Sequence, residues 1–377
     1  MRASETKCTG CGACAARCPK GCITMEEDRS GFLRPKIREE DCIHCGACDT
    51  ACPVGKQREG AVLGTFAAFI RQKATRYNSS SGGVFTALAL RVLEEGGVVF
   101  GAAFDGTRLR HVSARQEGEL GPLRGSKYLQ SDASAGIREA LRALGEGKTV
   151  LFTGTPCQIA GLRQGVGEHP NLIAVEVICH GVPSNKVWDA YLEELEQKAG
   201  APVRSVHFRD KTHGWTDYRM RVTFANGKKK STRRALDPYL RGYQGNLFLR
   251  ESCYDCPFKD GGSGADLSLG DFWGQRKMAP DLDDDRGTSL VLVRTARGQA
   301  LWDRCAGDLN ITPVDTAAAL RHNPAAWTSV PKNPNREAFL EALGKEPFTI
   351  LADRFAPVSL KTRIKSRIPA KLKRLRK

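Results

Sequence analysis

Short apolar runs alternate with amphipathic segments along most of the chain, and this alternation predicts a fold that contains both strands and helices. The runs have the length of strands. Strands are predicted at Val62–Ile70, Val98–Phe104, Leu109–Arg115, Thr149–Gly154, Leu172–Cys179, Ser205–Arg209, Tyr218–Phe224, Ala265–Gly274 and Ser289–Arg294. Because helical patterns stand between several of these runs, the order of elements indicates an α/β fold of the mixed α+β type.

Helices are predicted between the strands and after them. They are expected at Val84–Leu93, at Ala135–Leu144, from Thr155, from Ser184 to about Lys198, around Pro238–Gly242, at Gly298–Leu309 and after the loop Pro331–Pro334. Ser184 is well placed to cap its helix, because a serine hydroxyl accepts a hydrogen bond from the first turn. Asn226 and Gly227 favour a hairpin turn. The segment Ala74–Gly83 is predicted as a loop.

Two strand–turn–helix units follow one another in the middle of the chain. The strand Thr149–Gly154 leads to Cys157, and the strand Leu172–Cys179 ends in a cysteine of its own. In a parallel sheet the carboxyl ends of neighbouring strands meet at one edge, where ligands bind. We therefore expect the thiols of Cys157 and Cys179 to lie near each other.

The first fifty-six residues follow a different pattern, which is set by cysteines. A C-x2-C-x2-C-x3-C-P run occurs twice, with its cysteines at Cys8, Cys11, Cys14 and Cys18 and then at Cys42, Cys45, Cys48 and Cys52. This is the ligand spacing of a bacterial-type ferredoxin with two 4Fe–4S clusters, in which the fourth cysteine of each run ligates the other cluster. One cluster is thus assigned Cys8, Cys11, Cys14 and Cys52, and its twin Cys42, Cys45, Cys48 and Cys18.

Zinc binding and disulfides are the alternatives for this cysteine-rich segment. Zinc sites use two C-x2-C pairs rather than two runs of four, and a disulfide framework needs a secretory context. No signal peptide precedes Cys8. The pattern therefore favours clusters and a reducing, cytoplasmic location. Cys22 is outside the motif and is expected to be a packed thiol.

Length and charge narrow the possibilities further. The chain has 377 residues, which leaves room for one large or two ordinary domains after the cysteine runs. No apolar run is long enough to span a bilayer. The net charge of +16 is concentrated at the end, where Lys361–Lys377 holds nine basic residues and no acid. This tail is expected to be solvated, or else to contact anionic lipid at a membrane surface; no nucleic-acid module is recognised.

A second set of cysteines lies outside the doubled motif. Its members are Cys157, Cys179, Cys253 and Cys256. Four thiolates would hold a third 4Fe–4S cluster. The alternatives are unrelated thiols, a redox pair at Cys253 and Cys256, or a catalytic cysteine beside His180. The last is weaker, because adjacent residues of a strand point to opposite faces. Cys305 falls within a predicted helix and is expected in the core.

Two polar loops are candidates for contact with a cofactor. In the first, the hydroxyls of Ser79–Ser81 could cap the following helix, and Gly82 and Gly83 could bring backbone amides close to a phosphate. Ordinary helix capping explains the same residues equally well. In the second loop, Gly125–Ser131, Lys127 could meet a flavin or a phosphate, although most such lysines are solvated.

Taken together, the motifs resemble a known family. The cysteine head is followed by SSSGGVFTAL, KYLQS, FTGTPCQIAGL, CHGVPS, FRDKTHGW, CYDCPF and ADLSLGDFWG, in that order. This series, over roughly residues 5 to 325, resembles the coenzyme F420 hydrogenase/dehydrogenase beta-subunit family. The resemblance implies FAD held without a covalent bond in a mixed α/β domain, electron passage between clusters and flavin, and hydride exchange with a carrier. In some members the carrier is a deazaflavin, and plant relatives reduce a chlorophyll derivative.

The resemblance also implies roles for particular residues. The expected FAD contacts are Ser80, Ser81, Gly82, Gly83, Lys127, Thr153, Gly154 and Thr155. The expected catalytic residues at the substrate face are His180, Arg209 and Lys211, with Trp215 beside them. The cysteines Cys157, Cys179, Cys253 and Cys256 match family cysteines expected to hold a cluster near the flavin.

The sequence thus predicts a ferredoxin-like domain at residues 1–56, a flavin-binding domain at 60–330 and a C-terminal helix with a basic tail at 331–377. The function expected is that of an iron–sulfur flavoprotein oxidoreductase that works with coenzyme F420 or another small organic substrate. A protein partner, either a ferredoxin or a subunit of a complex, would exchange electrons with the head. The alternatives are an electron-transfer subunit without a substrate site of its own, and a scaffold with structural clusters.

Overall fold

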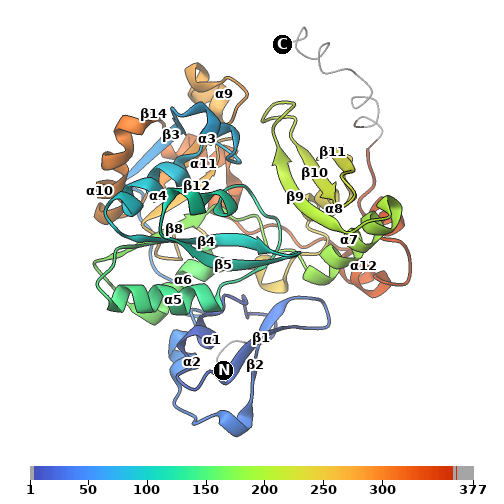
Figure 1. Ribbon diagram of the computed structural model, residues 1–377, viewed down its shortest axis with the longest axis horizontal. Coiled ribbons are helices and arrows are strands. Elements are labelled where there is room, and N and C mark those ends of the chain that lie inside the picture. The colour runs from blue at the N-terminus through green and yellow to red at the C-terminus, as the bar shows by residue number, and fades with distance from the viewer. Residues whose placement is uncertain (1–3, 360–361, 363–377) are drawn as a thin grey trace.

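The computed structural model describes residues 4–359 and 362, and it separates a small N-terminal head from a larger body (Figure 1). The head contains α1 (Ala13–Arg17), β1 (Ile23–Glu27), β2 (Leu33–Ile37) and α2 (Ala47–Ala51). Its two strands form an antiparallel hairpin. Each short helix starts after a glycine with positive φ, at 83° for Gly12 and 71° for Gly46, a conformation that glycine adopts without strain. The two cysteine runs therefore fold in the same way.

A nine-stranded mixed sheet forms the centre of the body. Its strand order is β14-β3-β13-β12-β8-β7-β4-β5-β6. The strands are β3 (Gly64–Ile70), β4 (Val98–Asp105), β5 (Arg108–Ala114), β6 (Ser131–Asp132), β7 (Val150–Gly154), β8 (Leu172–Val177), β12 (Leu267–Asp271), β13 (Ser289–Val293) and β14 (Leu309–Pro313). The four central strands β12, β8, β7 and β4 are parallel, so their carboxyl ends share one edge.

Helices cover both faces of this sheet. On one face lie α4 (Val84–Glu94) and α10 (Ala296–Cys305), and on the other lie α5 (Ser134–Gly145) and α6 (Pro156–Val166). Strand β4 shows how the two cores are separated: Val99 packs with the first pair of helices, and its neighbour Val98 packs with the second. Burial on both faces explains why the central strands read as continuous apolar runs.

A second lobe stands beside the sheet (Figure 1, yellow-green and red). It contains the three-stranded antiparallel sheet β9 (Val203–Asp210), β10 (Arg219–Phe224) and β11 (Lys229–Arg233), with α7 (Asn185–Ala199), α8 (Pro238–Gln244), α12 (Arg336–Ala342) and α13 (Phe348–Phe355). Trp188, Tyr239 and Phe339 belong to one aromatic core. The C-terminal helices α12 and α13 are thus packed against this lobe.

Most predicted elements are present, and several differ from the prediction. The helix expected at Gly298–Leu309 ends at Cys305, and the chain then forms β14 at the edge of the sheet. The strand expected to reach Cys179 ends at Val177. A short helix, α3 (Lys73–Tyr77), occupies the start of the predicted loop, and α13 was not predicted. The short helices α9 (Gln275–Met278) and α11 (Thr316–His322) complete the body.

The basic tail, Lys361–Lys377, lies almost wholly outside the described residues, so its predicted solvation or lipid contact stays a prediction. Within residues 4–359 and 362, none of the helices has both the length and the apolar character that crossing a membrane requires.

Candidate functional site

The cysteines of the head form two groups. The thiols of Cys8, Cys11, Cys14, Cys48 and Cys52 line a cavity of about 400 Å³. Cys52 is close enough for its charge to raise the pKa of Cys14. The last cysteine of the second run therefore lies beside the first run. Cys18 and Cys42 both lie beside Cys22, whose Sγ is 3.3 Å from that of Cys18. Cys52 and Cys18 thus lie where an exchange of fourth cysteines would need them, whereas Cys48 also lines the cavity of the first run; the ligand assignment stays a prediction.

The two cysteine groups differ in exposure. Cys45 is exposed, and Ile43 beside it is 56% exposed. In contrast, Cys11 is buried, and burial raises the pKa of Cys14 to about 12. One group therefore faces solvent, and the other faces the body of the protein. Cys22 is buried as a packed thiol, and Cys305 lies in the core, as predicted.

The head packs tightly against helix α6. A Cβ atom added to Gly161 would stand 2.9 Å from the Sγ of Cys11 and 2.9 Å from the Cβ of Ala13. Only glycine allows the head to come so near, because real Cβ atoms do not make contacts that short. On a neighbouring segment, Ser252 donates to the carbonyl oxygen of Cys8 at 3.3 Å.

The second set of cysteines gathers at the carboxyl edge of the sheet. Cys157 lies in the first turn of α6, Cys179 follows β8, and Cys253 and Cys256 come from the segment after α8. The charge of each of the other three thiols acts on Cys179, so the four form one group. Burial raises the pKa of Cys179 and raises that of Cys256 to about 12. Four thiols gathered in one group fit a 4Fe–4S cluster, whose iron would hold them as thiolates.

This group and the buried group of the head are adjacent. The charge of Cys157 acts on Cys11, across the packed contact at Gly161. The main-chain N–H of Val182 also donates to the Sγ of Cys253 at 3.4 Å. The three groups of thiols thus follow one another from the exposed end of the head to the edge of the sheet.

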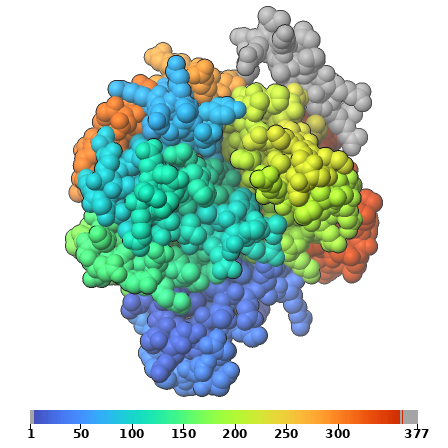
Figure 2. Space-filling view, in the orientation of Figure 1, coloured from blue at the N-terminus to red at the C-terminus, as the bar shows by residue number. Residues whose placement is uncertain are grey.

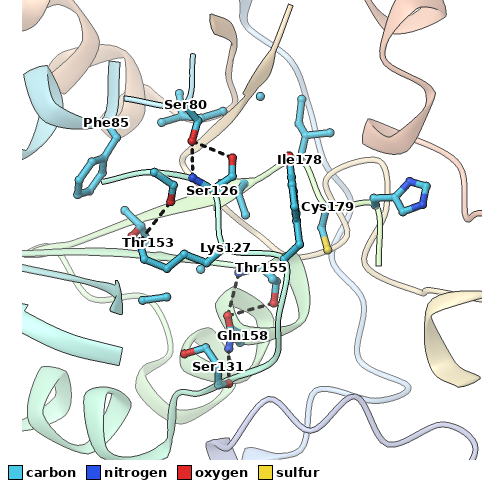
Figure 3. A pocket seen from close by; sticks show the side chains of 18 of the residues that line it. Ser80, Phe85, Ser126, Lys127, Ser131, Thr153, Thr155, Gln158, Ile178 and Cys179 are labelled. Carbon is cyan, nitrogen blue, oxygen red and sulfur yellow. Dashed lines mark hydrogen bonds between the residues drawn. The ribbon is translucent and has the colours of Figure 1, made fainter. Parts of the chain in front are cut away.

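The first cavity is lined in part by Cys157 and Cys179 of the second set of cysteines, and Cys179 is labelled in Figure 3. It has a volume of about 340 Å³, within the range of small-molecule sites. Its wall includes Thr9, Gly10, Ser80, Lys127, Cys157 and Cys179. Residues of the head, of two polar loops and of the second set of cysteines thus meet around one space.

The serine-rich loop contributes to the cavity differently from its predicted capping role. Helix α4 begins at Gly83, whose φ is 83°, and no side chain caps it. The Ser80 hydroxyl accepts hydrogen bonds from the N–H and the hydroxyl of Ser126, which ties the two polar loops together (Figure 3). Ser81 donates to the carbonyl of Thr288 at 2.8 Å, and the N–H of Gly82 donates to Ser289. The Gly82 amide is therefore already engaged.

The turn before α6 is held by a capping box. The N–H of Thr155 donates to the side-chain oxygen of Gln158 at 3.0 Å, and the two side chains are also hydrogen-bonded. The hydroxyl of Thr153 donates to the carbonyl of Phe100 at 2.9 Å. These bonds fix the turn, which lines the cavity from Thr153 through Gly154 to Thr155.

Lys127 lies between the first cavity and a neighbouring one. Its ammonium group donates to the carbonyls of Leu123, Arg124 and Gly125 at 2.9 to 3.3 Å. Burial lowers the pKa of Lys127 to about 8. The side chain therefore stabilises its own loop and places a positive charge at the wall that the two cavities share.

His180 and the basic residues at the end of β9 line different cavities of the site. His180 lines the first cavity; its Nε2 atom is buried and has no hydrogen-bond partner among the described residues. Burial lowers its pKa. Arg209 and Lys211 line the second cavity instead. The structure therefore does not bring the three predicted catalytic residues together around one space.

Arg209 and Lys211 are both engaged with the protein. Arg209 is ion-paired with Asp271, and its guanidinium lies 4.4 Å from the ring centre of Tyr218. Trp215 donates to Asp271 at 3.3 Å and so supports the same pair. Lys211 donates to three carbonyl oxygens, including that of Ser81. Lys211 thus holds the serine-rich loop in place. Burial, followed by the positive charge of Arg209, lowers the pKa of Lys211 to about 7.

The second cavity opens between the sheet and the second lobe, which meet along a seam in Figure 2. Its volume is about 490 Å³. The basic side chains in its wall are Arg124, Lys127, Arg204, Arg209, Lys211 and Arg221. Its acidic residue, Asp210, is ion-paired with Arg221 at 2.8 Å. The wall therefore carries an excess of positive charge, which favours anions.

Family models match most of the chain between residues 7 and 317. A 4Fe-4S dicluster domain matches residues 7–56, and the N-terminal and C-terminal models of the coenzyme F420 hydrogenase/dehydrogenase beta subunit match residues 65–138 and 147–317. The chain belongs to the coenzyme F420 hydrogenase/dehydrogenase beta-subunit family. It is an iron–sulfur electron-transfer protein of a family whose members work in oxidoreductase complexes.

A solved structure is also similar to this member of the beta-subunit family. It is a chain of the F420-reducing NiFe hydrogenase complex from Methanosarcina barkeri, studied by xenon derivatization. The two share 19% sequence identity with a TM-score of 0.49, and the match covers 81% of this chain and 93% of the other. No curated protein matches this chain.

Sequence reasoning missed two features of the site in this family member. The second cavity arises where β9 meets the sheet, and its basic side chains come from segments far apart in the sequence. Arg250, which is buried at the contact between head and body, also carried no motif signal. Its position three residues before Cys253 was the available hint.

Proposed function

We propose that this protein passes electrons between 4Fe–4S clusters and an FAD bound in the first cavity, and exchanges hydride with coenzyme F420 or another small organic substrate. The observation that carries this proposal is the wall of the first cavity. Cys157 and Cys179 stand on one side of it, and the hydrogen-bonded loops of Ser80 and Ser126 stand on the other. A molecule in this space contacts both the residues of a potential cluster and a polar cradle.

The order of the thiol groups supports electron transfer. The group of the exposed Cys45 is nearest to solvent, the group of Cys11 follows, and the group of Cys157 lies at the cavity. We propose that each group holds one 4Fe–4S cluster. A protein partner, a ferredoxin or a subunit of a complex, would then exchange electrons at the exposed end.

The cavity offers suitable contacts for a dinucleotide. Bound FAD would supply the exchange between single electrons and a hydride. The positive end of helix α6 favours a pyrophosphate. We propose that Ser80, Ser81, Gly83 and the turn from Thr153 to Thr155 bind the cofactor. Lys127 would place its charge near the ring and stabilise negative charge there.

The second cavity supports a site for the substrate. Its wall is shared with the first cavity at Ser80 and Lys127, and its basic excess favours a substrate with an anionic group. We propose that Arg209 and Lys211 shape this pocket while Arg209 keeps its ion pair and Lys211 keeps its hydrogen bonds to main-chain carbonyls. His180, with its unpartnered Nε2, is placed to hold or release a proton at the first cavity.

A purely electron-transferring subunit is the second candidate. The exposed thiol of Cys45 and the exposed side chain of Ile43 give the distal group a surface on which a partner could dock. In that case the first cavity serves a partner enzyme, and the isolated chain converts no small molecule.

Anaerobic purification, with iron, sulfide and flavin quantified, tests the proposal. About twelve irons and one FAD per chain are expected, because each of three clusters holds four irons. About eight irons with one FAD would remove the third cluster. Eight irons without flavin, even after FAD is supplied, would overturn the proposal that this protein binds FAD.

The two candidate functions are then separated by turnover. The isolated chain, once loaded, is mixed with reduced deazaflavin and then with other hydride donors, and reduction of the clusters is followed in the visible spectrum. Reduction by a donor supports an enzyme with its own substrate site. Reduction that occurs only with a partner protein present supports the electron-transfer subunit.

A further inference from the structure

Arg250 crosses the boundary between the head and the body. Its main chain belongs to the body, where its N–H donates to Val182 at 2.9 Å and its carbonyl accepts from Cys253 at 3.0 Å. Its side chain reaches the head: Nη1 donates to the carbonyl of Leu33 at 3.3 Å, and a Cβ on Gly10 would lie only 2.1 Å from it. The residue is 1% exposed.

The charge of Arg250 has no carboxylate partner among the described residues. Its Nε and Nη2 atoms are buried and make no hydrogen bond there. The nearest acid in sequence, Glu251, pairs instead with Lys332 at 2.8 Å and with Arg336 at 3.6 Å. A buried guanidinium without a counter-charge is costly, so the folded protein must supply a negative group near it.

The groups that could supply this negative charge are thiols. The charges of Cys253, Cys8 and Cys157 act on the guanidinium, and they come from both sides of the boundary. Cys8 belongs to the buried group of the head, and the other two belong to the second set of cysteines. A 4Fe–4S cluster with four thiolate ligands is an anion, and it gains one more negative charge when it is reduced.

We propose that Arg250 is the shared counter-cation of two 4Fe–4S clusters, one in the head and one in the body, and that it sets their reduction potentials. This inference rests on the proposed function, because it requires the third cluster. The buried positive charge stabilises the reduced form of each cluster more than the oxidised form, and so raises both potentials. The two unpartnered nitrogens are available to donate to cluster sulfurs, which acts in the same direction.

A shared cation also suits transfer between the clusters. When one electron moves from the head cluster to the body cluster, the first is oxidised and the second is reduced. The guanidinium faces ligands of both, so the electron remains near the same positive charge before and after the step. The electrostatic cost of separating the electron from a counter-charge is therefore small. Arg250 is a positioning residue in this scheme, since it contacts no substrate.

The test uses the full-length, cluster-loaded protein and the variants Arg250→Gln and Arg250→Lys. Anaerobic redox titration followed by low-temperature electron paramagnetic resonance gives the potential of each cluster. Arg250→Gln is expected to lower the potentials of two of the three clusters and to leave the third unchanged. Arg250→Lys keeps the charge and is expected to shift them less.

Arg336→Gln is the matched control. Arg336 is also buried and also faces Phe32, at 6.0 Å from the ring centre, but its charge is paired with Glu251 and Glu337. This variant is expected to leave all potentials at wild-type values. Equal shifts in Arg336→Gln and Arg250→Gln would overturn the inference, since they would indicate a general disturbance.

Each outcome separates this inference from the proposed function. A wild-type protein with only eight irons would remove the third cluster, and the proposed function would fail first. Twelve irons in Arg250→Gln with unchanged potentials would overturn the counter-cation alone. If Arg250→Gln fails to load its clusters, loading in Arg250→Lys supports the role of the charge, and failure of both variants overturns it.

Discussion

Buried cations surround the thiols and the cavities, and each is stabilised in its own way. Arg209 is paired with a carboxylate, Lys127 and Lys211 donate to backbone carbonyls, and Arg250 lacks a carboxylate among the described residues. A lysine that donates to neutral carbonyls keeps its net positive charge, whereas a cation paired with a carboxylate has that charge neutralised. The walls of the site therefore favour anionic ligands over neutral ones of the same shape.

His111 gives the fold a measurable sensitivity to acid. It is 4% exposed, its ring nitrogens are 2.8 Å from the Ser131 hydroxyl and 2.9 Å from the Thr153 carbonyl, and burial lowers its pKa from 6.5 to about 4. Because the folded pKa is below the unfolded one, the unfolded chain binds more protons between these values. The stability contributed by neutral His111 is thus present above pH 6.5 and is lost as the pH falls toward 4.

The prediction is tested by comparing wild-type protein with His111→Gln. From pH 6.5 to 5, the free energy of unfolding of the wild type should fall by up to about 1.4 kcal/mol per pH unit more than that of the variant. Circular dichroism during thermal unfolding under anaerobic conditions gives the two curves. Parallel curves over this range would contradict the assigned pKa direction.

At the scale of elements, glycine in α6 sets the distance between head and body. In an exposed helix, Gly→Ala normally stabilises by up to about 1 kcal/mol. Gly161→Ala is expected to do the opposite, because its Cβ would stand 2.9 Å from Cys11 and Ala13. The variant should lose iron from the head and unfold at a lower temperature, as measured by iron analysis and calorimetry.

Gly165 on the same helix is the matched control. A Cβ there would lie 3.3 Å from the flexible side chain of Arg17, which can move aside. Gly165→Ala should therefore keep its iron and be as stable as the wild type or more so. Similar losses in both variants would indicate that the helix itself, not its contact with the head, needs glycine.

The start of α7 offers a second test at this scale. The Ser184 hydroxyl accepts from the N–H of Val187 at 3.3 Å and donates to the carbonyl of Ser30 in the head. Ser184→Ala should cost about 1 kcal/mol of stability through the lost cap, and more through the lost tie to the head. Chemical unfolding measures the change, with the exposed Ser205→Ala as the control expected to stay near zero.

Elements whose residues show a local sequence pattern could be predicted, whereas elements that form through contacts with distant segments could not. Val150–Gly154 is mostly apolar, and the cap at Ser184 is local, so sequence alone located both. β14 instead forms because Leu309–Pro313 finds an unpaired edge at β3, which no local pattern reveals. The predicted ligands of the head follow from spacing, whereas the second cavity and Arg250 depend on contacts between distant segments.

At the scale of the whole molecule, the thiol groups form a series from solvent to the first cavity. Cys256→Ser is expected to remove about four irons and to leave the clusters of the head in place. A reductant that acts at the exposed end should then still reduce the head, while reduction of bound flavin slows strongly. Stopped-flow absorbance separates these two events.

Cys305→Ser controls for the loss of a buried thiol. Cys305 lies at the end of α10, in the core and apart from the four grouped cysteines. This variant should keep all its iron and reduce flavin at the wild-type rate. Fast flavin reduction in Cys256→Ser would show that electrons do not pass through the second set of cysteines.

The positions of the thiols along the chain also order the protein's biogenesis. All the predicted ligands of the head lie between Cys8 and Cys52, so they leave the ribosome together and could receive iron and sulfide early. The second set of cysteines spans Cys157 to Cys256 and becomes complete only after β8 and α8 have been made. The contact at Gly161 then closes over one side of the head. We therefore expect the proposed buried cluster of the head to be loaded more easily before the body folds against it than afterwards.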